Sequence, residues 1–314
     1  MVSMVVLPII YFIFFALFTW KNFRWAVFLF VLLLPTYLMR VDLFNVGRYV
    51  FPSTVLELSF GALFLTWLFI YARTDWSKIL VLAQKYKWFF IALGLFFISS
   101  VVSIFVSDMW FFSFGEWRAY FLEPMLLFVV LLGRKEIFKR DDFFWALAFS
   151  TISISIYAVI QKFTGWGIAT PEWTNEATRR VTAFFTSPNA IGLYVAPVLM
   201  LMILVLLMKV KQLSAQDKRL GQLLRQPIVL GLLAMITTAG LAIVFTKSQG
   251  TVIGLGAGTM AFLFFVGYRK ITVALAVIGI TVVLIIPSMR QAILFQDQAN
   301  QNRLRLWGYS WNFL

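Results

Sequence analysis

Residues Arg179–Pro197 read RRVTAFFTSPNAIGLYVAP, and within this stretch a polar loop becomes an apolar helix. Pro188 suits the first turn of a helix, where its missing N–H costs nothing, and Ser187 or Asn189 can cap the free amides there. The two arginines that open the stretch therefore lie just before a helix start, where cations and exposed N–H groups can bind an anion together. A charged loop at a membrane boundary is the alternative at this point.

The composition around this stretch is that of a membrane protein. Hydrophobic residues make up 61% of the 314 residues and charged residues only 13%, whereas a soluble domain has about 25% charged residues. Apolar windows of roughly 17 to 22 residues recur, and each is long enough to cross a hydrocarbon core about 30 Å thick. The net charge of +14 would indicate nucleic acid in a soluble chain. Here the cations separate apolar runs, so we expect no nucleic-acid partner.

The apolar windows predict an all-α, polytopic bundle of about ten transmembrane helices with interfacial outer loops, in a single transmembrane domain over residues 1–314. The expected spans are residues 3–20, 25–39, 54–72, 88–106, 117–133, 143–162, 189–208, 227–246, 250–268 and 270–288.

Cations occupy every second loop between these windows, in clusters at residues 21–24, 73–87, 134–140, 209–225 and 269–270. By the positive-inside rule these loops are cytoplasmic. Residues 40–53, 107–116 and 163–188 are then outside, and so is the loop that contains Arg179 and Arg180. Tryptophans in the outer loops are expected to anchor them in the membrane interface.

The chain contains no cysteine and no histidine. Disulfides and thiolate metal sites are therefore excluded, and so is the commonest general base at neutral pH. We expect no metal and no cofactor. Four acidic residues could act as a base in principle, although their spacing favours none of them: Glu123, Glu172, Glu176 and Asp297. Glu57, like Glu123, lies within or beside a span, where an ionisable group is costly and is a functional candidate.

Two further segments have simple interpretations. Gly250, Gly254 and Gly258 recur every four residues, which favours close helix packing over a phosphate-binding loop. The basic loop at residues 209–226 favours anionic membrane lipids as its partner.

Three cationic elements are predicted on the outer side: Arg179 with Arg180, the turn Lys247–Gly250, and a tail with Arg290, Arg303 and Arg305. Guanidinium groups and helix N-termini match the oxygens of a phosphate. A cationic pocket at membrane depth suggests a lipid-linked phosphate, with its apolar tail among the helices.

Two polar stretches each lead into a span that contains glycine. RVTAFFTSPN at Arg180–Asn189 is followed by Gly192 and Tyr194, and TKSQG at Thr246–Gly250 is followed by a Gly-rich run. The first resembles the signature loop of the O-antigen ligase and O-antigen polymerase superfamily of bacterial envelope proteins. The second resembles that family's Ser-Arg-Gly turn.

Two more stretches extend the resemblance over nearly the whole chain. Trp117–Pro124 is similar to an Arg/Glu-Pro segment of many members, and Arg303 or Arg305 with Trp307 resembles the Arg and Trp that open the family's large outer loop.

The resemblance implies a metal-independent glycosyltransferase in the bacterial cytoplasmic (inner) membrane, with its active face outward. Its donor would be a glycan on undecaprenyl diphosphate, and its acceptor a lipid, a glycan or a protein, as in lipopolysaccharide and cell-envelope polysaccharide biosynthesis. Carried over to this chain, Arg180 would bind the donor diphosphate with help from Arg179, and Lys247, Ser248, Gln249 and Asn189 would contribute, with Arg303 and Arg305 from the outer loop.

Two features depart from the family pattern. Gln249 occupies the arginine position of the Ser-Arg-Gly turn, so the charge has to come from Lys247. The outer-loop histidine that the family uses as the base is absent, which leaves the catalytic base unassigned. Because the large outer loop would begin at about residue 289 and the sequence stops at Leu314, we expect a truncated chain that lacks the rest of the loop and the final spans.

Two other functions stay open on the sequence. Many spans and helix-start cations also fit a transporter or a lipid flippase, although no paired interrupted helices and no buried acidic relay support one. The absent histidine also fits an inactive fragment or an assembly subunit.

Overall fold

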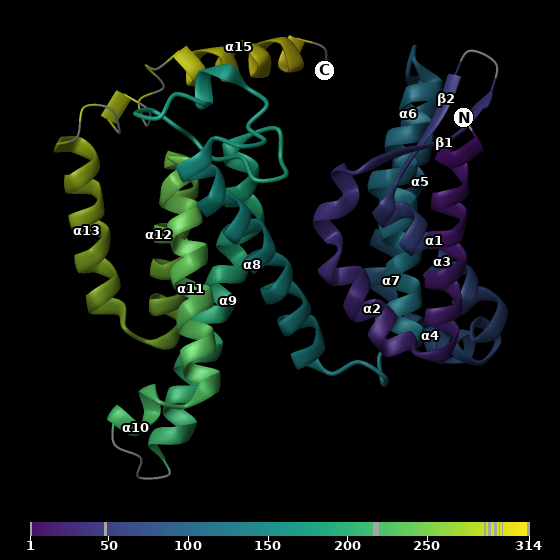
Figure 1. Cartoon of the computed structure of the whole chain (residues 1–314), viewed down its shortest axis with the longest axis horizontal. Helices are drawn as coiled ribbons and strands as arrows, with labels where there is room; N and C mark the ends of the chain where they lie inside the picture. The colour runs from purple at the N-terminus through teal and green to yellow at the C-terminus, as the bar shows by residue number, and fades with distance from the viewer. Residues whose placement is uncertain are drawn as a thin grey trace. The chain divides into compact units, whose positions relative to one another are not determined.

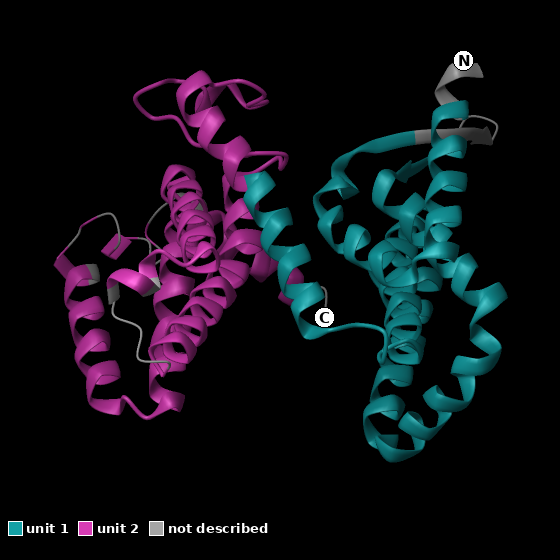
Figure 2. Ribbon diagram, turned by 60° about the horizontal axis from the view of Figure 1, so that its bottom comes forward, with its two compact units in different colours: residues 1–154 teal, residues 155–314 magenta. Residues whose placement is uncertain are grey.

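The structure is a computed structural model and describes residues 2–46, 49–215, 220–285, 287, 290–291, 294, 296 and 298–312. Contacts divide the chain into two compact units, unit 1 over residues 1–154 and unit 2 over residues 155–314 (Figure 2). Each unit is described by itself below. The expected single transmembrane domain stays a prediction.

Unit 1 consists of helices and one β-hairpin, and helix α8 continues from it into unit 2. Its elements are α1 (Val2–Lys21), α2 (Phe23–Leu32), the 3₁₀-helix η1 (Leu34–Leu38), β1 (Arg40–Val46), β2 (Tyr49–Thr54), α3 (Val55–Ile70), α4 (Ala72–Lys85), α5 (Lys87–Val106), α6 (Trp110–Trp117), the π-helical turn η2 (Arg118–Leu122), α7 (Glu123–Gly133) and the first part of α8 (Arg140–Thr164). The hairpin and α6 lie at one end of the unit and α4 at the other (Figure 1).

The core of unit 1 is formed by apolar side chains from α1, α2, α3 and α7. Phe15, Val27, Leu63 and Val130 are all buried in it. Helix α3 begins with a capping box, in which Thr54 and Glu57 satisfy each other's backbone amides. Unit 1 thus has its own hydrophobic core.

A β-hairpin follows the short helix in the expected span at residues 25–39. The expected span at 25–39 ends as α2 at Leu32, and Pro35 stands in the first turn of η1 because it has no N–H to continue an α-helix. Residues 40–53, which we expected as an outer loop, then form most of the antiparallel pair β1 and β2. The β-branched and aromatic residues of this segment favour strands.

Unit 2 contains the rest of α8, the 3₁₀-helix η3 (Pro171–Trp173), α9 (Pro188–Ser214), α10 (Leu220–Leu224), α11 (Pro227–Thr246), α12 (Gln249–Val266), α13 (Arg269–Ile285) and α15 (Gln298–Asn312). Helices α9 and α11 make its main interface, where Ile191 and Met202 of α9 and Leu232 of α11 are buried. Helix α15 lies at one end of this unit and α10 at the other (Figure 1).

Five described helices are long and apolar enough to cross a bilayer: α5, α8, α9, α11 and α12. A sixth span results if α3 and α4 count as one, although they meet at a bend of 93°. The chain is therefore a helical membrane protein. Each of the ten expected windows contains helix, but ten spans are not confirmed, because only these five or six described spans are long and apolar enough and α2, for example, has only 10 residues where about 20 are needed. Which end faces the cytoplasm also stays a prediction.

Candidate functional site

A cavity with a volume of about 1100 Å³ lies within unit 2. Four segments form its wall: the loop before α9, the first half of α9, the α11–α12 turn with the start of α12, and α15. Its charged and polar lining residues are Arg180, Asn189, Lys247, Ser248, Gln249, Thr251, Asn300 and Arg303.

Gln161 of α8 determines the shape of the loop that carries Arg180. Its buried side-chain oxygen accepts hydrogen bonds from the backbone amides of Thr182 and Ala183, at 3.0 and 2.7 Å. Its amide nitrogen donates to the carbonyl oxygen of Ala183 at 3.2 Å. Ala183 has a left-handed backbone with φ of 48°, which is uncommon outside glycine. One buried glutamine thus holds the turn that follows Arg180.

Arg180 is held against the end of α11. Its Nε donates to the carbonyl oxygen of Thr246 at 2.9 Å, and an amino group contacts Asn189 Oδ1 at 3.5 Å. A guanidinium has five N–H donors, so these two contacts leave three for a ligand in the cavity. Burial lowers the pKa of Arg180 from its ordinary value, yet an arginine remains charged at physiological pH.

The turn between α11 and α12 places Lys247 and Ser248 at the same cavity. Lys247 follows α11 with a left-handed φ of 51°, and its ammonium lies 3.4 Å from the carbonyl oxygen of Ala177. Ser248 caps α12 by accepting from the amide of Thr251 at 3.4 Å, and its own amide donates to Thr246 Oγ1 at 3.1 Å. The turn therefore has a fixed geometry.

Two helices begin at this cavity. Ser187 caps α9 and accepts from the amide of Asn189 at 3.3 Å, with Pro188 as the first helical residue. Ser248 caps α12 in the same way. The N-terminus of an α-helix carries a partial positive charge, so both helix starts add to the potential of Arg180 and Lys247.

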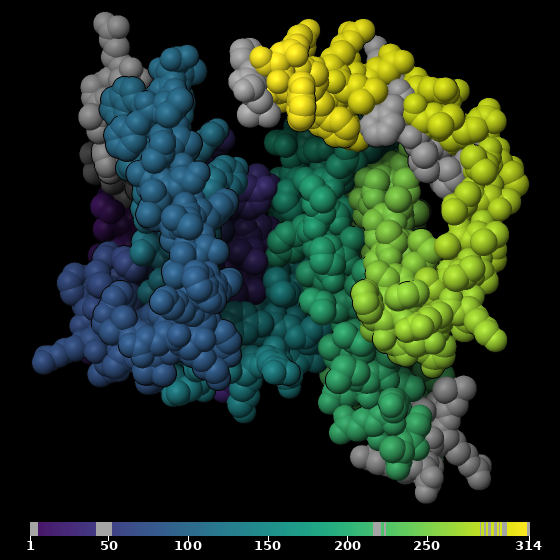
Figure 3. Space-filling model, turned by 180° about the vertical axis from the view of Figure 1, so that it is seen from behind, coloured from purple at the N-terminus to yellow at the C-terminus, as the bar shows by residue number. Residues whose placement is uncertain are grey.

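Helix α15 contributes the third cation. Asn300, Arg303 and Trp307 lie on one face of α15 and all line the cavity, and Arg303 donates to Asn300 Oδ1 at 2.9 Å. Figure 3 shows α15 in yellow across the end of the green helices of unit 2. Arg303 therefore faces the same space as Arg180 and Lys247.

The lining of the cavity is polar in one part and apolar in the other. Leu193, Ala196, Pro197 and Met200 of α9 line its other part, together with Ile253, Gly254 and Leu255 of α12. Its polar part carries three cations, and no carboxylate is among the described lining residues. Such a cavity suits an anionic head group joined to an apolar chain.

Not every expected site residue lies at this cavity. Arg179 is buried, and its guanidinium donates to the carbonyl oxygen of Thr174 at 3.1 and 3.0 Å and to that of Lys162 at 2.9 Å. It holds the loop in shape and does not line the cavity. Arg305 is exposed on α15 and is also absent from the lining. Asn300 and Thr251 are lining residues that the sequence did not predict, although the spacing of Asn300 from Arg303 places both on one helix face.

None of the described acidic base candidates lines the cavity. Glu172 and Glu176 are exposed loop residues, and Asp297 lies outside the described residues. Glu123 belongs to unit 1, where the guanidinium of Arg118 lies 3.5 Å from Glu123 and 2.9 Å from Glu57. An ion-paired role is therefore sufficient to explain these two acids.

Comparison of the chain with known proteins identifies no relative. No protein-family model, curated protein or solved structure matches the chain. The function therefore has to be inferred from the residues of the cavity.

The glycines of α12 pack closely at only one of the three predicted positions. A Cβ on Gly258 would lie 3.0 Å from the sulfur of Met200 in α9, as the packing interpretation predicts. A Cβ on Gly250 or Gly254 would meet nothing within 4 Å, and both glycines line the cavity, so the interpretation is wrong for these two positions. Close contact also occurs at Gly192 of α9, where a Cβ would lie 2.7 Å from the Cβ of Thr251. Helices α9 and α12 approach one another at this point, next to both helix starts.

Replacing Gly192 with alanine is expected to force α9 and α12 apart. Overpacking of this kind costs about 1 to 3 kcal/mol of unfolding free energy, and it would also move the start of α12 relative to Arg180. The melting temperature of the purified protein measures this effect. Gly240→Ala in α11 is the matched control, because its Cβ would meet nothing within 4 Å. Equal melting temperatures for the two variants would contradict the close contact.

Proposed function

We propose that the protein is an O-antigen ligase-like glycosyltransferase that binds a glycan on undecaprenyl diphosphate in the unit 2 cavity. One observation carries the proposal: Arg180, Lys247 and Arg303, which are far apart in the sequence, line one cavity that also has an apolar part. A diphosphate needs several cations, and a polyprenyl chain needs an apolar path.

The chemistry follows from the charge of the leaving group. The acceptor oxygen bonds to the anomeric carbon of the glycan while the bond from that carbon to the phosphate oxygen breaks. Undecaprenyl diphosphate leaves with the electron pair, and the acceptor hydroxyl releases its proton to water through a base. Negative charge develops on the diphosphate as this bond breaks. Fixed cations and helix N-termini therefore stabilise the transition state more than the ground state. The described cavity residues supply this half of the reaction, and the base is not among them.

The proposed setting is the bacterial cytoplasmic membrane with the cavity on its outer face. The proposed acceptor is a lipid, a glycan or a protein. The distribution of cations between loops supports this orientation, because α15, whose residues line the cavity, lies at the end of unit 2 opposite α10, which belongs to a cation-rich segment (Figure 1).

The direct test of this function is glycan transfer in proteoliposomes. They would contain the purified protein, undecaprenyl diphosphate carrying a labelled glycan, and a candidate acceptor. We expect labelled acceptor and free undecaprenyl diphosphate in equal amounts. Uptake of an intact lipid-linked glycan across the vesicle membrane, with no label on any acceptor, would instead indicate a flippase.

Arg303 and Arg305 offer a matched pair of substitutions on α15. Arg303 lines the cavity whereas Arg305 does not, so Arg303→Gln is expected to weaken binding of undecaprenyl diphosphate by about ten-fold, which is the effect of one charge-assisted hydrogen bond. Arg305→Gln should change the dissociation constant by less than about two-fold. Equal losses in the two variants would indicate only a general effect of net charge.

A further inference from the structure

Helix α4 of unit 1 has a geometry that the proposed transferase does not use. The apolar helix α3 ends at Ile70, and α4 continues at 93° to it. If α3 stands across the bilayer, a helix at a right angle to it runs along the membrane surface. With α3 alone as the spanning part of this bent pair, α4 would lie where the hydrocarbon core meets the head groups.

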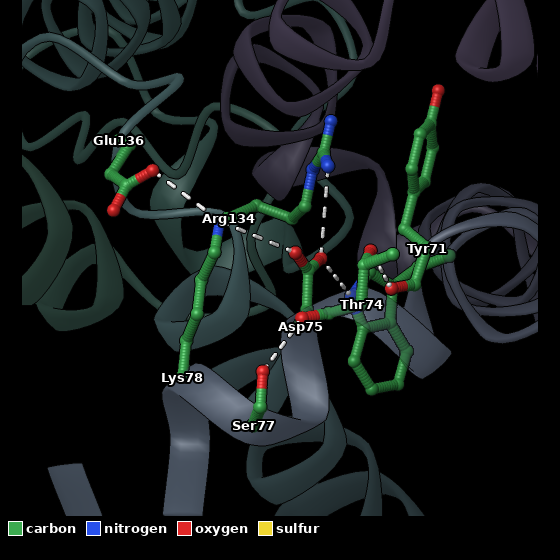
Figure 4. Close-up of polar contacts among 8 residues, drawn as sticks. Tyr71, Thr74, Asp75, Ser77, Lys78, Arg134 and Glu136 are labelled. Atoms are coloured by element: carbon green, nitrogen blue, oxygen red, sulfur yellow. Dashed lines mark hydrogen bonds and ion pairs between the residues drawn. The ribbon is translucent and has the colours of Figure 1, made fainter. Parts of the chain in front are cut away.

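A buried carboxylate holds α4 in this direction. Asp75 is 1% exposed and accepts a hydrogen bond from the indole N–H of Trp67 at 3.1 Å. Arg134, at the end of α7, and Lys78 each place a nitrogen 3.8 Å from its oxygens (Figure 4). The guanidinium of Arg134 also lies 3.9 Å from the ring centre of Tyr71. Asp75 therefore joins α3, α4 and α7.

The backbones of α4 and α7 also approach closely. A Cβ on Gly133 would lie 2.9 Å from the Cβ of Asp75 and 3.4 Å from Ile79. Ile79 is buried one turn after Asp75, so this face of α4 packs on unit 1. Both the ion pairs and the packing keep α4 across the axis of α3.

The opposite face of α4 combines apolar and cationic side chains. Trp76, Leu80 and Val81 are 53%, 48% and 64% exposed. Arg73 and Lys85 are also exposed, whereas Asp75 is the one acid in the sequence of α4. Because that acid is buried and paired, the exposed charged side chains of α4 itself are all cationic, and the exposed Glu136 beside it pairs with Lys78 at 3.3 Å, away from Arg73 and Lys85 in the sequence.

Lys87 and Trp88 continue this surface at the start of α5. Trp88 is 79% exposed, and the ammonium of Lys87 lies 5.9 Å from its ring centre. Tryptophan prefers the depth of the head groups, and lysine extends from there toward phosphates. The surface thus combines an apolar part for acyl chains with cations for phosphate.

We propose that α4 lies in the head-group layer of the membrane and binds anionic phospholipid through Arg73, Lys85 and Lys87. The charge of its exposed face selects this partner, because each cation near an anionic surface favours association by roughly five-fold. The complementary surface is the bilayer that surrounds α3 and α5. Asp75 and Arg134 act here as positioning residues that keep α4 parallel to that surface.

The absence of cysteine makes a site-specific test possible. Val81→Cys provides a single attachment site for a nitroxide spin label on the exposed face. Full-length protein would be reconstituted in vesicles of phosphatidylcholine alone and of phosphatidylcholine with phosphatidylglycerol. Collisions with oxygen, which enters the bilayer, and with a water-soluble nickel complex report the depth of the label.

We expect oxygen to reach the label more readily than the nickel complex, and this ratio to rise several-fold in the anionic vesicles. In the same background, Arg73→Gln with Lys85→Gln and Lys87→Gln should abolish the difference between the two vesicle types. The control changes three exposed cations outside the basic segments at residues 73–87 and 209–225, namely Lys270, Arg290 and Arg305, to glutamine and should preserve this difference. Equal ratios in both vesicle types for the parent protein would overturn the proposal, and so would a label shielded from both reagents, which would indicate a protein partner on α4.

Discussion

Replacing Arg180 with alanine is expected to lower glycan transfer by at least about 100-fold, as removal of one preorganised donor to a developing negative charge does in other enzymes. Arg180 lines the polar part of the cavity, and its remaining N–H groups are placed for the leaving diphosphate. The measurement is the initial rate of transfer of labelled glycan in proteoliposomes with matched amounts of protein.

The fold should tolerate this change. Arg180→Ala removes its hydrogen bond to the carbonyl oxygen of Thr246, which is worth about 1 to 2 kcal/mol of unfolding free energy. Arg180→Lys keeps the charge but not the planar fork, so we expect it to restore only part of the activity. A full transfer rate in Arg180→Ala would remove this residue from the mechanism.

Replacing Arg179 with alanine is expected to have the opposite profile, with a large loss of stability. Its guanidinium is buried and makes three hydrogen bonds to carbonyl oxygens of Thr174 and Lys162. Removing it takes the donors from these part-buried acceptors, at a cost of about 2 to 4 kcal/mol. The melting temperature and the rate of protease cleavage in the 165–187 loop are the measurements.

Substitution of Arg179 is therefore expected to affect stability, whereas substitution of Arg180 is expected to affect donor binding. Arg179→Lys should not restore stability, because a single ammonium cannot reproduce the arrangement of the guanidinium donors. Arg305→Ala is the control, since Arg305 is exposed and lies away from the cavity lining. Unchanged stability of Arg179→Ala together with reduced transfer would assign Arg179 to the donor site.

Local features of the sequence predicted much of this arrangement. Ser187 with Pro188 marked the start of α9, and caps act within one helical turn, so neighbouring residues suffice to locate them. Apolar length likewise located the helices, because a hydrocarbon core sets a minimum run of apolar residues. These inferences need no knowledge of tertiary contacts.

Which arginine lines the cavity and which glycines pack closely depends on tertiary contacts that the sequence does not reveal. Arg179 and Arg180 are adjacent and chemically identical, and only the loop shape held by Gln161 determines which of them lines the cavity. The approach of α9 to α12 at Gly192 depends on Thr251, which lies far away in the sequence. The glycine stripe of α12 was interpreted correctly at Gly258 but not at Gly250 and Gly254, since spacing alone cannot distinguish a packed face from a cavity wall.

The β-hairpin shows a different limit. Residues 40–53 were expected as an outer loop because they join two apolar windows on the side opposite the cationic loops. Pairing of β1 with β2 satisfies their backbone groups, and Pro52 lies in β2, the second of only two strands in the sheet. Strand preference depends on the partner strand, so a short segment read alone does not reveal it.

The central claim is that the cavity recognises a diphosphate on a polyprenyl chain. The most direct test compares equilibrium binding of undecaprenyl diphosphate and of uncharged undecaprenol by the purified protein in one detergent. With three cations at the cavity, we predict at least about 100-fold tighter binding of the diphosphate, corresponding to about two charge-assisted contacts. Equal affinity for the two lipids would contradict the account.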